Sequence, residues 1–68
     1  MDEFGTEFPY GIGRVAKREL AANGYTRYDH LTTTTAKDLL RIHGIGKKAI
    51  GILREELASR GLGFSDES

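Results

Sequence analysis

A repeated glycine-rich segment constrains what this chain can fold into more than any other feature. Residues Gly11–Ala16 read Gly-Ile-Gly-Arg-Val-Ala, and 33 residues later Gly44–Ala49 read Gly-Ile-Gly-Lys-Lys-Ala. Both copies close on a glycine followed by an apolar residue, at Gly24 and at Gly61. Each copy therefore predicts a tight turn that opens a helix, and a helix that ends on a glycine in the left-handed conformation. Two copies are too few for a solenoid, so we expect a closed pseudo-symmetric pair.

The spacing of apolar and capping residues predicts four helices and no β-strand. Their expected bounds are 13–23, 28–31, 36–42 and 47–60. The inward faces are expected to carry Val15, Ala16, Leu20, Leu39, Leu40, Ile42, Ala49, Leu53 and Leu57. Thr35 and Asp38 form a capping box, in which each side chain accepts a hydrogen bond from the other residue's amide. The predicted fold class is all-α, a compact domain of four to five helices.

Acidic residues gather at the two ends of the chain, and all the basic residues lie between them. Residues 1–7 and 65–68 are polar, acidic and aperiodic, so we expect them to be disordered and residues 8–64 to fold as one domain. The whole chain has a net charge of zero, but ten basic and five acidic residues give residues 8–64 a charge of +5. This distribution permits a nucleic-acid partner, although ordinary solubilising charge explains it as well.

Several classes of function are disfavoured by what the chain lacks. It has no cysteine, so neither a disulfide nor a thiolate zinc site is available, and His30 and His43 are its only histidines. No nucleophile is accompanied by a base, so we expect no enzymatic activity, no cofactor and no metal. No apolar run approaches membrane-spanning length, and the first residues are acidic where a secretory signal is basic. We expect a cytoplasmic, monomeric protein.

The second glycine-rich copy carries the features of a phosphate site. Gly44 has to adopt a backbone conformation closed to side chains, and Ile45 should point inward and hold the turn on the core. Gly46 then leaves its own amide and those of Lys47 and Lys48 uncovered at the positive end of a helix. Free amides and two lysines at a helix N-terminus favour the binding of a phosphate.

Alternatives stay open for both copies. The turn at 44–46 could merely connect two helices, with the lysines as a solvated first turn, but basic residues there oppose the helix dipole unless an anion is bound. The first copy is either a degenerate repeat that completes the core or a second phosphate clamp, with Arg14 and Arg18 as its contacts. His43 lies in the second turn and is a further candidate contact, although a single histidine in a turn is often incidental.

The segment from Leu39 to Leu53 resembles the helix-hairpin-helix signature, because its leucines, isoleucines, glycines and Ala49 stand at the spacing of that signature. From Ile12 to Phe64 the chain also resembles the C-terminal domain of the bacterial RNA polymerase alpha subunit, most closely over 39–63. That resemblance implies a SAM-like domain with two pseudo-symmetric helix-hairpin-helix units. In that family the domain binds the minor groove of promoter DNA and also touches transcription activators.

The resemblance also implies individual contacts. Carried over by position, Gly46 and Lys48 match residues that contact DNA in the family, and Lys47 lies between them. The family's principal minor-groove arginine aligns to Val15, and a neighbouring asparagine aligns to Arg18. A narrow A·T minor groove attracts inserted arginine, so the loss of that arginine implies that this chain holds DNA without the family's sequence preference.

The sequence therefore predicts a module that binds double-stranded DNA through its backbone phosphates on the minor-groove side, with little sequence specificity and a role related to transcription. Its expected DNA-contacting residues are Gly44, Ile45, Gly46, Lys47, Lys48, Arg14, Arg18 and His43. The alternative is an adaptor that docks on another protein of the transcription machinery, such as RNA polymerase, because the net charge is zero and the minor-groove arginine is missing.

Overall fold

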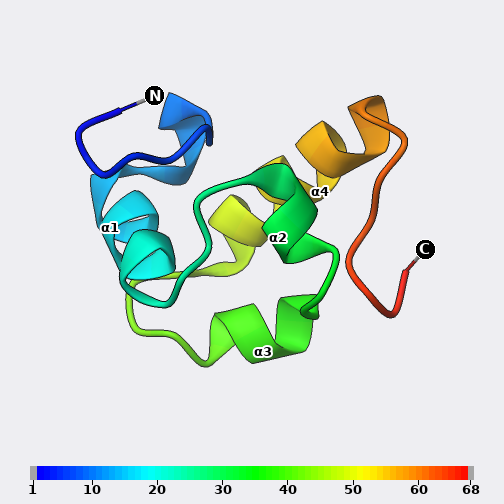
Figure 1. Cartoon of the computed structure of the whole chain (residues 1–68). Helices are drawn as coiled ribbons and strands as arrows, with labels where there is room; N and C mark the ends of the chain where they lie inside the picture. The colour runs from blue at the N-terminus through cyan, green and yellow to red at the C-terminus, as the bar shows by residue number, and fades with distance from the viewer. Residues whose placement is uncertain (1, 68) are drawn as a thin grey trace.

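Helices are the only regular secondary structure among residues 2–67, which the computed structural model describes (Figure 1). A single 3-10 turn, η1 (Tyr10–Ile12), leads into four α-helices. They are α1 (Arg14–Ala22), α2 (Tyr28–Leu31), α3 (Ala36–Leu40) and α4 (Lys47–Ser59). The all-α class and the four helices are confirmed, with α3 ending two residues earlier than expected. The turn η1 is not predicted, because three residues are too few to show a helical period.

The two glycines that were expected to end helices do so in the same way. Gly24 and Gly61 have φ angles of +87° and +73°, in the left-handed region that favours glycine. Each glycine amide donates to a helix carbonyl at 3.0 Å, and the amide of the next residue donates to a carbonyl of the last turn at 2.8 Å. These donor–acceptor pairs are Gly24–Ala21, Tyr25–Leu20, Gly61–Ala58 and Leu62–Leu57. Both α1 and α4 therefore end in a Schellman motif.

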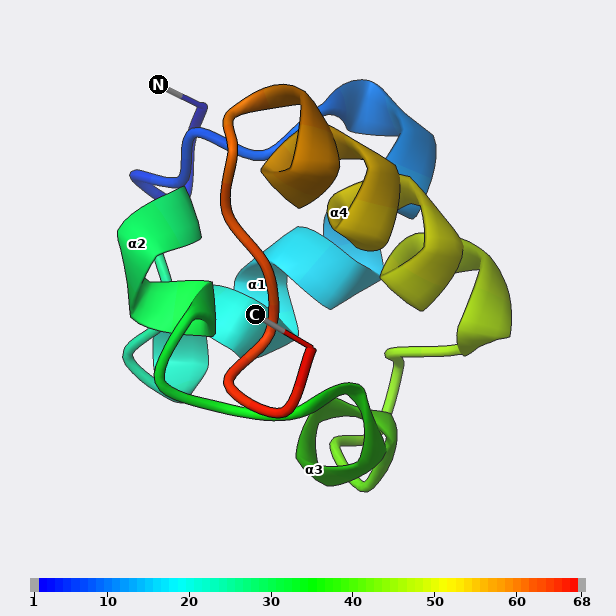
Figure 2. The same ribbon diagram turned by 90° about the vertical axis from the view of Figure 1, so that its right-hand side faces the viewer.

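The two glycine-rich copies lie against each other, and each contacts the helix of the other copy. Gly44 has a φ angle of +91°, and a β-carbon added there would lie 2.6 Å from Val15 Cγ1 and 3.4 Å from Glu19 Cγ, both in α1. In the first copy, a β-carbon added at Gly11 would lie 3.0 Å from Ile52 Cδ1 in α4. Figure 2 shows η1, in blue, beside α4, with α1, in cyan, below η1. The turn at Gly44 therefore needs glycine both for its backbone angle and for its close approach to α1.

The core combines the apolar stripes of the helices with aromatic residues from both ends of the chain. Its buried members are Phe8, Ile12, Ala16, Leu20, Tyr28, Leu31, Leu39, Ile45, Ala49, Ile50, Leu53, Leu57 and Phe64. The prediction of an inward-facing side chain was wrong for two residues, because Val15 is 46% exposed and Leu40 is 41% exposed. Each stands one residue from a buried position, Ala16 or Leu39, and therefore about 100° around the helix from the buried stripe.

An N-terminal strap, residues 2–7, packs across the start of α1. The Asp2 carboxylate accepts hydrogen bonds from the Thr6 hydroxyl at 2.5 Å and from the Thr6 amide at 3.0 Å. The Lys17 ammonium lies 3.0 Å from the same carboxylate, and Lys17 is only 5% exposed. Residues 2–7 were expected to be disordered. Local composition could not reveal these contacts, because the ion pair joins the strap to a helix that follows it in the chain.

Residues 65–67 are also held on the domain. The Ser65 amide donates to the Thr34 carbonyl at 2.9 Å, and the Arg54 guanidinium donates to both carboxylate oxygens of Glu67, at 2.7 and 3.0 Å. The C-terminal tail was expected to be disordered, but residues 65–67 make these contacts. Met1 and Ser68, the outermost residues of the two predicted disordered segments, lie outside the described residues.

The Asp2 carboxyl should couple the stability of the fold to pH. Hydrogen bonds from Thr6, together with the Lys17 ammonium, hold the pKa of Asp2 well below its usual value of 3.8. Folding therefore favours the ionised form, and this contribution is present above about pH 4 and is lost as the pH falls further. Between about pH 5 and pH 3, the melting temperature of the wild type should fall more steeply than that of Asp2→Asn.

Circular dichroism at a series of pH values measures this difference. Asp66→Asn is the matched control, because the Asp66 carboxylate makes no hydrogen bond or ion pair among residues 2–67. This variant should follow the wild type across the same pH range. Equal slopes for Asp2→Asn and the wild type would contradict the role given to Asp2.

Candidate nucleic-acid interface

The connection between α3 and α4 is a tight turn anchored by one buried side chain. Ile45 is 4% exposed and lies in the core, as predicted, and its amide donates to the Ile42 carbonyl at 3.1 Å. His43, Gly44 and Gly46 are all exposed. The anchor therefore presents the backbone of the turn to solvent, and Ile45 can contribute to a site there only by holding that backbone in place.

The N-terminus of α4 carries no capping group. Gly46 occupies the N-cap position, no side chain accepts a hydrogen bond from the first turn, and that turn contains no acidic residue. The amides of Gly46, Lys47 and Lys48 have no acceptor among residues 2–67, and the first helical hydrogen bond runs from Ile50 to the Gly46 carbonyl at 3.1 Å. A β-carbon added at Gly46 would meet no atom within 4 Å. Three donors at the positive end of the helix dipole are thus open to solvent, which is the geometry that the sequence predicted.

Ion pairing separates four basic side chains from the other six. Six basic residues pair with carboxylates at N···O distances between 2.6 and 3.2 Å. The basic residues with no acidic partner among residues 2–67 are Lys37, Arg41, Lys47 and Lys48. All four are exposed and lie in one segment, residues 36–48, which contains Asp38 as its one acidic residue. The unpaired positive charge of the described chain is therefore gathered on this α3–α4 segment.

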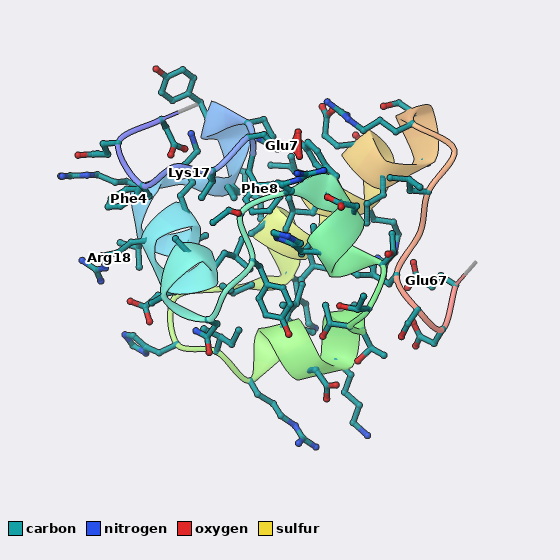
Figure 3. All side chains as sticks on the ribbon, viewed as in Figure 1. Phe4, Glu7, Phe8, Lys17, Arg18 and Glu67 are labelled. Atoms are coloured by element: carbon teal, nitrogen blue, oxygen red, sulfur yellow. The ribbon has the colours of Figure 1, made fainter. Side chains whose placement is uncertain are left out.

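The two arginines predicted for the first copy are both paired. Arg14 makes a bidentate pair with Glu3, with distances of 2.7 Å from Nε to Oε1 and 3.1 Å from Nη2 to Oε2. Arg18 Nε lies 3.2 Å from a carboxylate oxygen of Glu19. Figure 3 shows Arg18 on the same side of the molecule as Phe4 of the strap, with Glu67 on the opposite side. The structure thus brings the first copy next to the second, but with the charges of its arginines neutralised.

Lys37 and Arg41 are basic residues of this segment that the glycine-rich motif does not indicate, because neither belongs to the repeat. They stand out only once the partners of the other six basic residues are known. Three of those pairs join a helix to one of the chain ends, and they link Asp2 to Lys17, Glu3 to Arg14 and Arg54 to Glu67. A pattern read along the chain cannot supply such pairings.

The chain shares sequence with a small part of a DNA helicase. It is similar to the ATP-dependent DNA helicase Hel308 of Caldivirga maquilingensis, with 44% identity over 46 residues. The similar stretch covers 68% of this chain but only 6% of the helicase. No protein-family model and no solved structure match the chain. The helix-hairpin-helix assignment and the resemblance to the polymerase alpha domain therefore stay predictions.

Within the described part of the chain, no three His, Cys, Asp or Glu side chains form a group that could hold a metal ion. The longest helix, α4, has 13 residues, and no helix among residues 2–67 has the length and apolar character needed to cross a bilayer.

Proposed function

We propose that this chain is a DNA-binding module that holds double-stranded DNA through its backbone phosphates. The amides of Gly46, Lys47 and Lys48 bind a phosphate together with the two lysine side chains, while Arg41 and Lys37 extend the contact along the backbone. The α3–α4 segment acts as a helix-hairpin-helix unit applied to the minor-groove side of the duplex. The proposed activity is binding and not catalysis.

One observation carries this proposal. The uncapped N-terminus of α4 and the four basic side chains without acidic partners among residues 2–67 occupy the same segment. Lysines in the first turn of a helix are disfavoured by the helix dipole, and an anion relieves that conflict. A phosphate offers acceptors to the three amides and opposite charge to the lysines. The similarity to a protein named as a DNA helicase supports DNA as the source of that phosphate.

The contacts proposed for the α3–α4 segment predict weak and largely sequence-independent binding. Phosphate contacts position a protein on a duplex but do not read its bases. The position where the resemblance would place a minor-groove arginine holds Val15, whose side chain lies over Gly44. We therefore expect dissociation constants on the order of 10⁻⁵ M at physiological salt, and equal affinity for A·T-rich and G·C-rich duplexes.

The test is a titration of the wild-type chain with one duplex of each kind, followed by fluorescence anisotropy at several salt concentrations. Two to four phosphate contacts should give a slope of log K against log salt between about −2 and −4. In parallel, amide chemical shifts on adding DNA should change most at residues 44–48. Absence of duplex binding at low salt, or shifts concentrated elsewhere, would overturn the proposal.

A second candidate function is an adaptor that docks on a protein of the transcription machinery, such as RNA polymerase. The observation that favours it is the exposure of four large apolar side chains, which are Tyr10, Val15, Leu40 and Leu62. Apolar surface left in water favours burial by a partner. The same shift map separates the two functions, because an adaptor would leave the amides of 46–48 unchanged on adding DNA.

A further inference from the structure

The N-terminal strap places one carboxylate on each of two basic residues at the start of α1. Asp2 lies 3.0 Å from the Lys17 ammonium, and Glu3 holds the Arg14 guanidinium through two hydrogen bonds. In the second copy, no carboxylate among residues 2–67 pairs with Lys47 or Lys48. The strap therefore makes the chief electrostatic difference between the two copies.

The two strap contacts differ in how readily they can open. The side chains of Lys17 and Asp2 are 7% and 19% exposed, and Asp2 is also held by Thr6, which is itself buried. The side chains of Arg14 and Glu3 are 75% and 56% exposed. Exposed ion pairs contribute little to stability and are screened by salt. Asp2 thus anchors the strap, while Glu3 can leave Arg14 without disturbing the core.

We propose that Glu3 competes with a DNA phosphate for the Arg14 guanidinium. The Glu3 carboxylate thereby prevents the first glycine-rich copy from contacting DNA. A carboxylate that accepts two hydrogen bonds from a guanidinium offers the same charge and paired oxygens as a phosphate. The start of α1 lies beside the proposed site, because Val15 packs over the backbone of Gly44. This inference rests on the proposed function and concerns its regulation. The wild type binds through the α3–α4 segment alone, and loss of the Glu3 charge recruits Arg14 as an added contact.

The experiment compares Glu3→Gln with Asp29→Asn in duplex titrations over a range of salt. The control breaks a pair of the same kind, because Arg27 holds Asp29 through two hydrogen bonds and both side chains are more than half exposed. Both variants raise the net charge by one, so general attraction to DNA changes equally. Glu3→Gln should bind about threefold more tightly than Asp29→Asn at low salt, with a salt slope steeper by about 0.9.

A double variant tests whether the gain depends on Arg14. Glu3→Gln/Arg14→Gln has the same net charge as the wild type, and it should lack the gain in affinity that Glu3→Gln produces. Equal affinities and slopes for Glu3→Gln and Asp29→Asn would overturn the inference, while wild-type binding that depends on Lys47 and Lys48 would keep the proposed function. If neither the wild type nor Glu3→Gln bound a duplex, both would fall. If Glu3→Gln bound a duplex and the wild type did not, the competition would be supported. The assignment of the wild-type binding site to the α3–α4 segment would then be wrong.

Discussion

Replacing both Lys47 and Lys48 by glutamate should abolish most of the binding to duplex DNA and leave the fold intact. The change puts two negative charges beside the free amides of α4, so a phosphate there meets repulsion in place of attraction. Losing two phosphate contacts should make the salt slope shallower by about 1.8 and lower the affinity at low salt by at least about tenfold. Glutamate is favoured near a helix N-terminus by about 0.3–1 kcal/mol per residue, so the free energy of unfolding should stay the same or rise.

Fluorescence anisotropy and thermal unfolding together separate lost contacts from lost structure. The matched control is Arg27→Glu/Arg54→Glu, which changes the net charge by the same amount outside residues 36–48. This control should weaken binding far less than Lys47→Glu/Lys48→Glu does. Equal losses would show that the overall charge of the protein determines binding, and the assignment to the N-terminus of α4 would then be wrong.

Gly44→Ala should destabilise the fold by about 2–4 kcal/mol, for two separate reasons. The backbone at Gly44 has a φ angle of +91°, which strains any residue with a β-carbon. The new β-carbon would also lie 2.6 Å from Val15 Cγ1, too close for the two atoms to keep their places. In a domain of this size, the change corresponds to a melting temperature lower by about 10–25 °C.

Two further variants divide this loss between its causes. Gly24 has a similar φ angle of +87° with no atom within 4 Å of an added β-carbon, so Gly24→Ala measures the backbone strain alone. In Gly44→Ala/Val15→Ala the clash is removed, and stability should recover to nearly the level of Gly24→Ala. A Gly44→Ala variant as stable as Gly24→Ala would contradict the close approach of the turn to α1.

The fold was predictable wherever a local pattern decided it. Helical spacing located α1, α3 and α4, and the glycines at 24 and 61 marked the ends of α1 and α4. The repeat did not predict which of its glycines has a positive φ angle. In the second copy the first glycine, Gly44, has positive φ, whereas in the first copy it is the last glycine, Gly13. The first copy overlaps the 3-10 turn η1, whereas the second copy follows the helix α3. The chain therefore changes direction at a different glycine in each copy.

The candidate site was predictable to the extent that it depends on one helix end. The motif and the dipole argument both indicated the free amides of 46–48, and the structure has them uncapped. The charge on the surrounding surface was not predictable, because it depends on which basic residues the acidic ends neutralise. The repeat made Arg14 a candidate contact beside Lys47, but Glu3 pairs with Arg14. The basic residues without an acidic partner among residues 2–67 include Lys37 and Arg41 instead.

The contacts of Gly44 with α1 and of Gly11 with α4 determine how the surface formed by the α3–α4 segment can fluctuate. A turn held only by its own hydrogen bonds can open while the rest of a protein stays folded. Here, opening the turn at 44–46 draws Ile45 out of the core, and lifting η1 draws out Ile12. Both halves of the chain contribute to one buried core, and neither half retains a core when the other unfolds. The two halves should therefore unfold together. Hydrogen exchange in α1 and α4 should therefore report a single event, and the surface proposed to bind DNA should be as rigid as the interior behind it.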